Sequence, residues 1–231
     1  MTRIAILGDG RMGQLVAALA RESGDTVVAH LGPAETMQPL TRERLGDPEV
    51  VVEFTVPHAA ARLVRECLDA GVPVLSGTTG WDHERIVLEE HAVSGGRTFL
   101  WAPNFALGVH LFARVVADAA RRFAHPAAGF DAHLVETHHR KKLDAPSGTA
   151  KLLAQQAERS SDRAMPITSV RVGQVPGTHE VMFDAAFEQV RLVHEARDRR
   201  VFAAGALSVA RWLVDKRGVL TLDDFLGEVI A

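Results

Sequence analysis

The stretch from residue 136 to residue 150, ETHHRKKLDAPSGTA, concentrates side chains that could bind an acid and transfer a proton. Histidine titrates near neutral pH, so His138 or His139 could donate a proton to a substrate that receives a hydride. Adjacent histidines could instead bind a metal, but no Cys, His or carboxylate set at ligand spacing accompanies them. We therefore expect proton chemistry and no metal at this segment.

A predicted helix start follows directly, and its hydroxyls and free N–H groups would form an anion site. The residues concerned are Ser147, Gly148 and Thr149. The cations Arg140, Lys141 and Lys142 add positive charge, so a substrate carboxylate fits the segment well. Composition alone would favour a solvated basic loop at the same place.

Three glycines in the stretch GDGRMG, residues 8–13, fit a dinucleotide-binding loop. The pattern is common in turns, but here it follows a short apolar run and opens a predicted helix, as dinucleotide binding requires. The first glycine permits the tight turn, the second lets the backbone approach a pyrophosphate, and the third lets helix and strand lie close. The cofactor-binding residues expected here are Gly8, Gly10, Arg11, Met12 and Gly13.

The kind of dinucleotide is harder to predict. An NAD-specific site usually has an acid about 20 residues after the loop, at the end of the second strand. That place holds His30, Leu31 and Gly32, with neither an acid nor an arginine. His30 could contact a ribose hydroxyl or a 2′-phosphate, or be a strand-end histidine, and Arg11 could reach a phosphate. We expect NADH and/or NADPH as cofactor, with weak discrimination between them.

Two further turns follow predicted parallel strands, where ligands bind in open α/β sheets. Their hydroxyls and backbone N–H groups could hold a ribose or a nicotinamide amide, although such residues are also ordinary in turns. The residues expected to contact the cofactor are Phe54 and Thr55 in the first turn and Gly77, Thr78 and Thr79 in the second.

The elements that must position these residues alternate between strand and helix in the first half of the chain. Apolar, β-branched runs predict strands over 4–7, 26–29, 50–54, 72–75 and 98–102. Helical periodicity predicts helices over 12–22, 58–70 and 81–91. This alternation predicts an α/β fold, a Rossmann-type doubly wound parallel sheet.

The second half has a different order. Helices are predicted over 105–123, 148–159 and 205–216, and strands over 131–137, 167–172, 178–185 and 187–194. Serial strands of this kind indicate a second, α+β domain that carries a mixed sheet. We expect residues 1–105 and 200–231 to form the dinucleotide-binding domain, and residues 106–199 the substrate-binding and oligomerisation domain.

Composition narrows the class of protein. The 231 residues carry a formal net charge of −3 and no long basic tract, so nucleic acid is not an expected partner. No apolar stretch approaches the length of a membrane span. The single cysteine, Cys67, lies in an apolar helical pattern and is interpreted as core packing rather than a nucleophile. These features favour a cytoplasmic protein.

Taken together, these segments resemble 4-hydroxy-tetrahydrodipicolinate reductase, also called dihydrodipicolinate reductase. The matching stretches are residues 8–13, 54–57, 77–80, 102–105, 108–109 and above all 136–150, with weaker ones at 171–173, 176–179 and 199–206. The resemblance covers nearly the whole chain. It implies an NAD(P)H-dependent oxidoreductase of diaminopimelate and lysine biosynthesis that reduces a cyclic dicarboxylate, and a homotetramer built through the second domain's sheet.

The resemblance also implies roles for individual residues. His138 matches the proton donor and Lys142 the second catalytic residue, which would polarise the substrate. Substrate-carboxylate contacts are implied for His139, Ser147, Gly148 and Thr149. Gly77 and Thr79 match positions near the nicotinamide and ribose. Three further positions are implied near the cofactor: Asn104, Phe105 and Arg199.

The chain departs from the family pattern in a loop that is one residue shorter and in the missing charged residue after the second strand. Both departures concern cofactor preference. Two other functions stay open on the residues alone: an amino-acid or semialdehyde dehydrogenase of similar two-domain build, and a dinucleotide-sensing regulatory protein without turnover.

Overall fold

The computed structural model describes residues 1–123 and 128–229, and the chain divides into two compact units. One unit comprises Met1–Ala106 with Phe202–Ala231, and the other comprises Leu107–Val201. Each unit has its own sheet. Within the described residues, no helix is long and apolar enough to cross a membrane.

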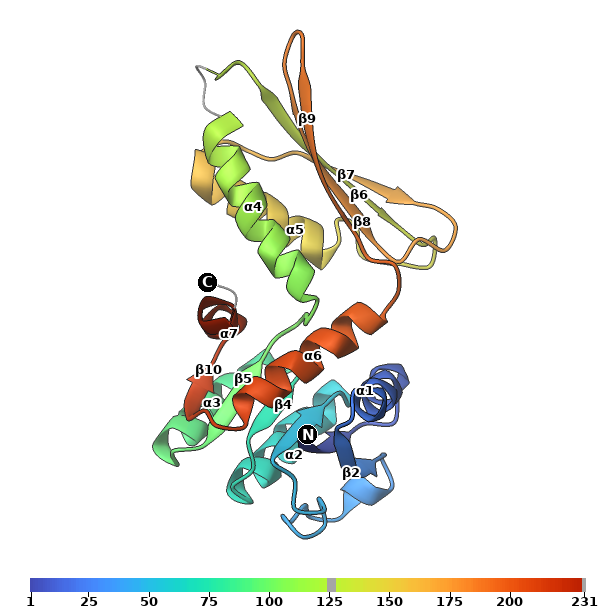
Figure 1. Cartoon of the computed structure of the whole chain (residues 1–231), viewed down its shortest axis with the longest axis vertical. Helices are drawn as coiled ribbons and strands as arrows, with labels where there is room; N and C mark the ends of the chain where they lie inside the picture. The colour runs from blue at the N-terminus through green and yellow to red at the C-terminus, as the bar shows by residue number, and fades with distance from the viewer. Residues whose placement is uncertain (124–127, 230–231) are drawn as a thin grey trace. The chain divides into compact units, whose positions relative to one another are not determined.

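A six-stranded parallel sheet forms the centre of the first unit, with strand order β10-β5-β4-β3-β1-β2 (Figure 1). Its strands are β1 (Arg3–Leu7), β2 (Thr26–Leu31), β3 (Val50–Glu53), β4 (Val74–Ser76), β5 (Thr98–Trp101) and β10 (Gly218–Leu220). Its helices are α1 (Arg11–Glu22), η1 (Glu35–Met37), α2 (Pro57–Asp69), α3 (Asp82–Ser94), α6 (Arg200–Leu213) and α7 (Leu222–Val229).

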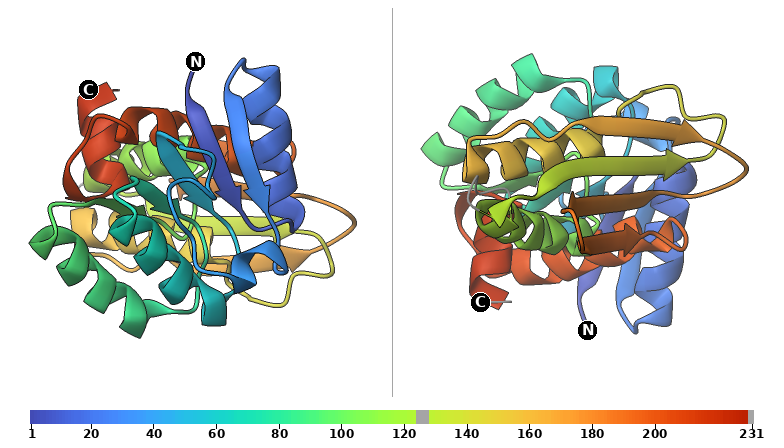
Figure 2. Two further views of the ribbon diagram at one scale, coloured as in Figure 1. Left: turned by 90° about the horizontal axis from the view of Figure 1, so that it is seen from below. Right: turned by 90° about the horizontal axis from the view of Figure 1, so that it is seen from above.

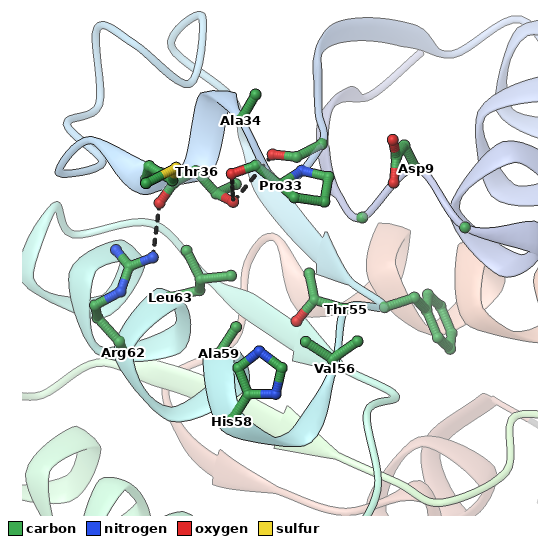
Figure 3. Close-up of a pocket in the computed structure, with 15 residues that line it drawn as sticks. Asp9, Pro33, Ala34, Thr36, Thr55, Val56, His58, Ala59, Arg62 and Leu63 are labelled. Atoms are coloured by element: carbon green, nitrogen blue, oxygen red, sulfur yellow. Dashed lines mark hydrogen bonds between the residues drawn. The ribbon is translucent and has the colours of Figure 1, made fainter.

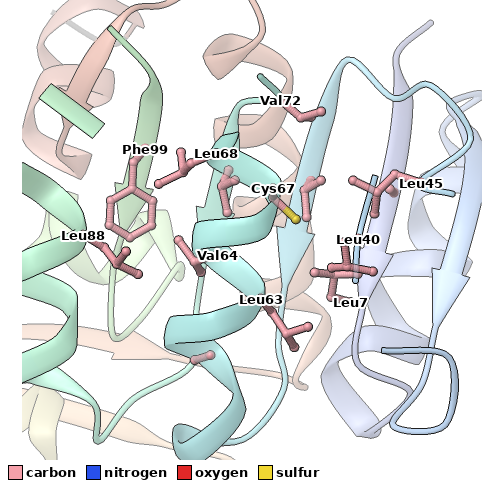
Figure 4. Close-up of a cluster of buried hydrophobic side chains, with 14 of the residues drawn as sticks. Leu7, Leu40, Leu45, Leu63, Val64, Cys67, Leu68, Val72, Leu88 and Phe99 are labelled. Atoms are coloured by element: carbon pink, nitrogen blue, oxygen red, sulfur yellow. The ribbon is translucent and has the colours of Figure 1, made fainter. Parts of the chain in front are cut away.

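Helices cover both faces of this sheet, which explains why its strands are apolar on both sides. On one face the strands contribute Ala5, Leu7, Val51, Val74 and Phe99 to a core that also contains side chains of α2 and α3 (Figure 4). Cys67 lies fully buried in the same core, and burial raises the pKa of its thiol, which confirms its interpretation as a packing residue.

A four-stranded mixed sheet, with order β7-β6-β8-β9, forms the second unit. Its elements are α4 (Leu107–Phe123), β6 (Asp131–His138), α5 (Gly148–Ser161), β7 (Ile167–Arg171), β8 (Thr178–Asp184) and β9 (Gln189–Glu195). Strands β6 and β7 are parallel, and the other pairs are antiparallel. Helices α4 and α5 pack against one face of this sheet, where they share a core with Leu134, Val181 and Phe183 (Figure 2).

The predicted fold class is confirmed: a Rossmann-type parallel sheet and a second α+β unit with a mixed sheet. The bounds of one helix were wrong. Helix α6 begins at Arg200 rather than at Gly205, because the Asp198 carboxylate accepts the Arg200 N–H at 2.7 Å and caps the helix start. Strand β10 and helix α7 were not predicted.

Candidate functional site

The glycine loop joins β1 to α1 and requires its glycines. Gly8 adopts a φ of +105°, and a Cβ on it would lie 2.1 Å from the Phe54 carbonyl oxygen. A Cβ on Gly13 would lie 1.8 Å from the Gly8 carbonyl oxygen. A Cβ on Gly10 would meet nothing within 4 Å. The loop is therefore packed tightly against the protein and open at the position where a phosphate would approach.

Three further residues predicted for this site, Arg11, Met12 and His30, lie near the loop. Arg11 and Met12 form the first two residues of α1, with Arg11 exposed. His30 in β2 has its Nε2 3.0 Å from the Gly8 carbonyl oxygen, so it ties the second strand to the loop. This contact supports the strand-end interpretation of His30 rather than a direct phosphate contact.

A cavity of about 490 Å³ adjoins the glycine loop (Figure 3). Its residues come from the loop, from the end of β2 and from the start of α2. The lining includes Gly8, Asp9, Gly32, Pro33, Ala34, Thr55, Val56, Ala59, Arg62 and Leu63. Backbone groups of the glycine loop lie near a helix start, and apolar side chains line the rest of the cavity. Such a lining suits a nucleotide, which has charged phosphates at one end and a flat base at the other.

Glu53 organises the two predicted turns, although sequence reasoning missed it. This carboxylate is fully buried at the end of β3. It accepts hydrogen bonds from the Thr78 hydroxyl at 2.6 Å and from the Thr55 backbone N–H at 2.7 Å, and also from the Thr55 and Ser76 hydroxyls. The hydroxyls of Thr55 and Thr78 therefore donate inward to Glu53.

The remaining predicted residues of the first unit differ in accessibility. Gly77 lies under the Phe54 ring, since a Cβ on it would be 2.0 Å from Phe54 Cε1. Phe105 is buried and meets Phe54 edge to face, with 6.1 Å between ring centroids. Thr79 is exposed in the turn after β4. Asn104 Oδ1 accepts the Ala106 N–H at 2.8 Å.

Arg199, the last residue predicted to lie near the cofactor, is exposed in the turn immediately before α6. It belongs to the second unit, within Leu107–Val201.

His138 and Glu136 form a buried pair on β6, in the second unit. His138 Nδ1 hydrogen-bonds to Glu136 Oε2, and both side chains are almost or fully buried. Burial alone would raise the pKa of Glu136, but hydrogen bonds from Arg171, Ser169 and His138 lower it to about 2. Because the carboxylate is ionised, Nδ1 must carry the hydrogen, and Nε2 is the nitrogen left for proton exchange.

Gly177 leaves room for that second nitrogen. A Cβ on Gly177 would lie 2.9 Å from His138 Nε2. Burial lowers the pKa of His138, and the hydrogen bond with Glu136 partly offsets this effect. A lowered pKa makes the protonated imidazole a stronger acid, which suits a proton donor.

Arg171 links this pair to the loop that carries Lys142. Its Nη2 donates to Glu136 Oε1 at 2.6 Å and to the Asp144 carbonyl oxygen at 2.5 Å. Lys142 Nζ lies 2.8 Å from Asp144 Oδ1 and is partly exposed. This ion pair lowers the pKa of Asp144, chiefly through its hydrogen bond with Lys142. His138, Glu136, Arg171 and Lys142 thus belong to one connected group.

The predicted anion site lies at the start of α5. Ser147 is the N-cap, and its hydroxyl accepts the Ala150 N–H at 3.1 Å. Gly148 is exposed, and a Cβ on it would meet nothing within 4 Å, so the helix start is open to a ligand. Thr149 is half-buried in the same turn, and His139 is half-buried at the end of β6. The structure therefore brings Ser147, Gly148 and Thr149 together at one open helix start, which could bind an anion.

His179 on β8 is a member of this group that sequence reasoning missed. Its Nε2 lies 3.2 Å from the Ser147 hydroxyl oxygen, and its ring meets that of His138 edge to face with 5.2 Å between centroids. Burial lowers its pKa to about 4, and the nearby His138 adds to the shift, so His179 is neutral at pH 7. The stretch PGTH, residues 176–179, was the only sequence signal for it.

The sequence showed no set of metal-ligand residues beside the histidines, but the fold brings such a set together. Glu136, His138 and His179 place one potential ligand atom each within 4.8 Å of one another. However, the Arg171 guanidinium already binds Glu136, and a fixed positive charge beside the carboxylate opposes a cation. The donor set therefore fits proton chemistry better than a metal, and the absence of a metal stays a prediction.

A nicotinamide dinucleotide fits the residues of the first unit. Its pyrophosphate could approach the backbone at Gly10 without a clash and meet the start of α1, which has no side-chain cap. The adjoining cavity could hold its adenosine. The residues that would hold it are the loop, the end of β2 and the turns after β3 and β4.

Comparison with protein families gives two matches. The model of the dihydrodipicolinate reductase N-terminus matches residues 2–105, and that of the dihydrodipicolinate reductase C-terminus matches residues 108–226. Curated relatives named 4-hydroxy-tetrahydrodipicolinate reductase are 33% identical in Christiangramia forsetii and 34% identical in Methanoregula boonei. Both alignments cover 98% of this chain and 98% of the relative.

Solved structures show the same fold. A dipicolinate-bound dihydrodipicolinate reductase from Paenisporosarcina sp. TG-14 superposes with a TM-score of 0.79, at 24% identity, over 96% of this chain and 97% of that one. An aspartate semialdehyde dehydrogenase from Vibrio cholerae gives 0.54 at 12% identity, over 93% and 98%. The second similarity shows a shared fold alone.

Proposed function

The chain belongs to the dihydrodipicolinate reductase family, and we propose that His138 and Lys142 carry out the proton chemistry of this family's reaction. That reaction is the NAD(P)H-dependent reduction of 4-hydroxy-tetrahydrodipicolinate to tetrahydrodipicolinate, in diaminopimelate and lysine biosynthesis. The chain is an NAD(P)H-dependent oxidoreductase. One hydride and one proton enter the substrate, and one water leaves it. The nicotinamide cofactor supplies the hydride when it is bound.

The hydrogen bond between His138 Nδ1 and ionised Glu136 carries this assignment. It fixes the ring and directs the exchangeable proton to Nε2. Lys142 adds a cation that polarises the substrate near its ring nitrogen. Both residues lie in one group with Arg171 and Asp144. In this proposal His138 supplies the proton and Lys142 stabilises the charge that develops as hydride arrives.

The substrate's carboxylates bind at the start of α5 in this proposal. The helix start offers backbone N–H groups and a positive dipole end to an anion. The residues assigned to this role are His139, Ser147, Gly148 and Thr149. Because the substrate is a dicarboxylate, one carboxylate at this helix start would orient the ring toward the proton donor.

Apart from Arg199, which belongs to the second unit, the residues assigned to cofactor binding lie in the first unit; substrate binding and oligomerisation are assigned to the second. The residues proposed to form the cofactor site, by direct contact or by holding its loop and turns, are Gly8, Gly10, Arg11, Met12, Gly13, His30, Phe54, Thr55, Gly77, Thr78, Thr79, Asn104, Phe105 and Arg199. Among them, the open backbone at Gly10 and exposed Thr79 are the best placed for direct contact. Phe54 and Phe105 support the turn from beneath through their mutual ring contact.

A coupled assay tests the reaction. The substrate is generated in place from pyruvate and aspartate semialdehyde by its synthase, and nicotinamide absorbance is followed with NADH and NADPH separately. We expect rapid oxidation that needs both the synthase and this protein. Absence of oxidation by protein that binds the cofactors would contradict the proposal and favour a related dehydrogenase or a dinucleotide sensor.

We also propose a homotetramer built through the second unit's sheet and acting in the cytoplasm. Helices α4 and α5 share a core with one face of that sheet. Strand alternation and register direct Val135, Val170, Met182 and Val193 to the other face. Val193 is 56% exposed and Val170 is 37% exposed. This face also carries the Arg191–Glu180 ion pair, and such a mixed face with exposed valines fits contact with a second copy. Light scattering coupled to size-exclusion chromatography checks the assembly.

A further inference from the structure

The end of β2 lacks an acid in the sequence, yet two carboxylates lie there in the structure. Gly32 directly follows β2. A Cβ on Gly32 would be 2.8 Å from Asp9 Oδ2 and 3.2 Å from Glu35 Oε2. Asp9 comes from the glycine loop and Glu35 from η1, so neither stands at the sequence position where such an acid is usually sought.

Glu35 is held in place by the backbone at this point. Its Oε2 accepts the Gly32 N–H at 3.0 Å. Asp9 and Gly32 both line the cavity that adjoins the glycine loop, and in Figure 3 Asp9 lies on the loop side of that cavity. The two carboxylates therefore flank the place where the side chain of a ribose-binding acid would begin.

Two arginines on this side of the unit, Arg62 and Arg44, are engaged elsewhere. Arg62 lines the cavity, but its guanidinium pairs with Glu66 at 2.8 Å and donates to the Thr36 carbonyl oxygen at 2.6 Å. The Arg44 guanidinium donates to the carbonyl oxygens of Glu35 and Pro39. The carboxylates of Asp9 and Glu35 are the groups nearest to a Cβ placed on Gly32.

We propose that Asp9 and Glu35 together take the part of the missing acid and make this chain select the unphosphorylated adenosine ribose, and so NADH over NADPH. The inference rests on the proposed dinucleotide site and replaces the weak discrimination expected from the sequence. A 2′-hydroxyl can donate to either carboxylate. A 2′-phosphate carries a charge of about −1.5 to −2 at pH 7 and would be repelled by both.

The test uses two pairs of ligands, of which the first pair lacks nicotinamide. Binding of 5′-AMP and of 2′,5′-ADP to the full chain is measured by calorimetry, and NADH and NADPH are compared by their fluorescence. We expect the 2′-hydroxyl ligand of each pair to bind at least about tenfold more tightly. Equal affinities within each pair, or tighter binding of the 2′-phosphorylated ligands, would overturn the proposal.

The variants Asp9→Asn and Glu35→Gln remove one charge each, and Glu35→Gln keeps an oxygen that can accept the Gly32 N–H. Each should raise the affinity for 2′,5′-ADP several-fold and so narrow the preference for 5′-AMP over 2′,5′-ADP. Glu22→Gln is the matched control, because it removes one exposed acid at the far end of α1, roughly 16 Å from the helix start. If the Glu22→Gln variant gained as much affinity for 2′,5′-ADP, net charge alone would explain the effect. That result would contradict a role of Asp9 and Glu35.

This test separates the inference from the proposed reaction. A chain that discriminates between the probes but shows no turnover in the synthase-coupled assay would lose the proposed function and keep the ribose selection. A chain that turns over with NADPH as well as with NADH would keep the function and lose the selection. If neither probe binds, the adenosine site itself is wrong and the inference falls with it.

Discussion

His138 and Glu136 show what two residues can determine when they stand two apart on a strand. Alternate residues of a strand point to the same face, so these two side chains must be neighbours. Their hydrogen bond leaves Nε2 as the site of proton exchange. Arg171 is the third partner, and it comes from β7, whose register places it directly beside His138.

Replacing Glu136 by glutamine tests this arrangement. The amide would keep the shape but lose the charge that raises the pKa of His138. We expect kcat to fall, by less than the roughly 10²–10⁴-fold loss expected for His138→Gln, and the alkaline limb of the pH–rate profile, where His138 loses its proton, to move to lower pH. Histidine titration by NMR gives the pKa of His138 independently of turnover.

Glu158→Gln provides the control, since it is the same change at an exposed residue of α5 in the same unit. It should leave the pH profile of kcat unchanged. A Glu136→Gln enzyme with an unshifted profile and unshifted His138 titration would show that Glu136 serves packing alone.

Individual elements of the first unit depend on polar contacts at their ends. The turns after β3 and β4 are joined by Glu53, and helix α7 begins with a reciprocal cap in which Thr221 and Asp224 bond each other's backbone N–H. The spacing of Thr221 and Asp224 is a recognisable helix-start signal, so α7 was predictable from the sequence. Glu53 was not, because a glutamate that ends a buried strand has no such pattern.

Replacing Glu53 by alanine should destabilise the first unit. The change leaves a cavity and removes the common acceptor of the Thr55, Ser76 and Thr78 hydroxyls. We expect a loss of about 3 kcal/mol in the free energy of unfolding, measured by urea denaturation. Ser76→Ala removes one donor and keeps the acceptor, and it should cost about 1 kcal/mol. Equal costs for the two variants would contradict the central role of Glu53.

At the scale of the whole molecule, buried histidines make stability depend on pH. His179 has its pKa lowered from 6.5 to about 4, and burial also lowers the pKa values of His138 and His194. The unfolded chain therefore binds more protons than the folded one between pH 6.5 and pH 4. Stability is complete above pH 6.5 and falls as the pH is lowered through this window.

The contribution of His179 can be isolated by replacing it with glutamine. At pH 5 the lowered pKa of His179 corresponds to about 2 kcal/mol of lost stability relative to pH 7.5. The His179→Gln variant should therefore lose about 2 kcal/mol less than the unaltered chain between these two pH values, measured by urea unfolding. Parallel losses in the two proteins would show that His179 titrates normally in the folded state.

The sequence by itself determined the local parts of this protein. Apolar periodicity located most strands and helices, the glycine spacing indicated the proposed dinucleotide loop, and the segment from residue 136 to residue 150 indicated the proposed proton donor and anion site. Each of these signals lies within one element or one turn, where spacing along the chain equals proximity in space.

Only the tertiary structure decided which distant side chains complete the two sites. Arg171 and His179 reach Glu136, His138 and Ser147 through the pairing of β6 with β7 and β8; Ser147 and His179 are 32 positions apart in the sequence, and Glu136 and Arg171 are 35 apart. Asp9 and Glu35 converge on Gly32 because a loop, a strand end and a short helix meet there. Spacing in the sequence carries no record of such contacts, since the packing of separate elements creates them.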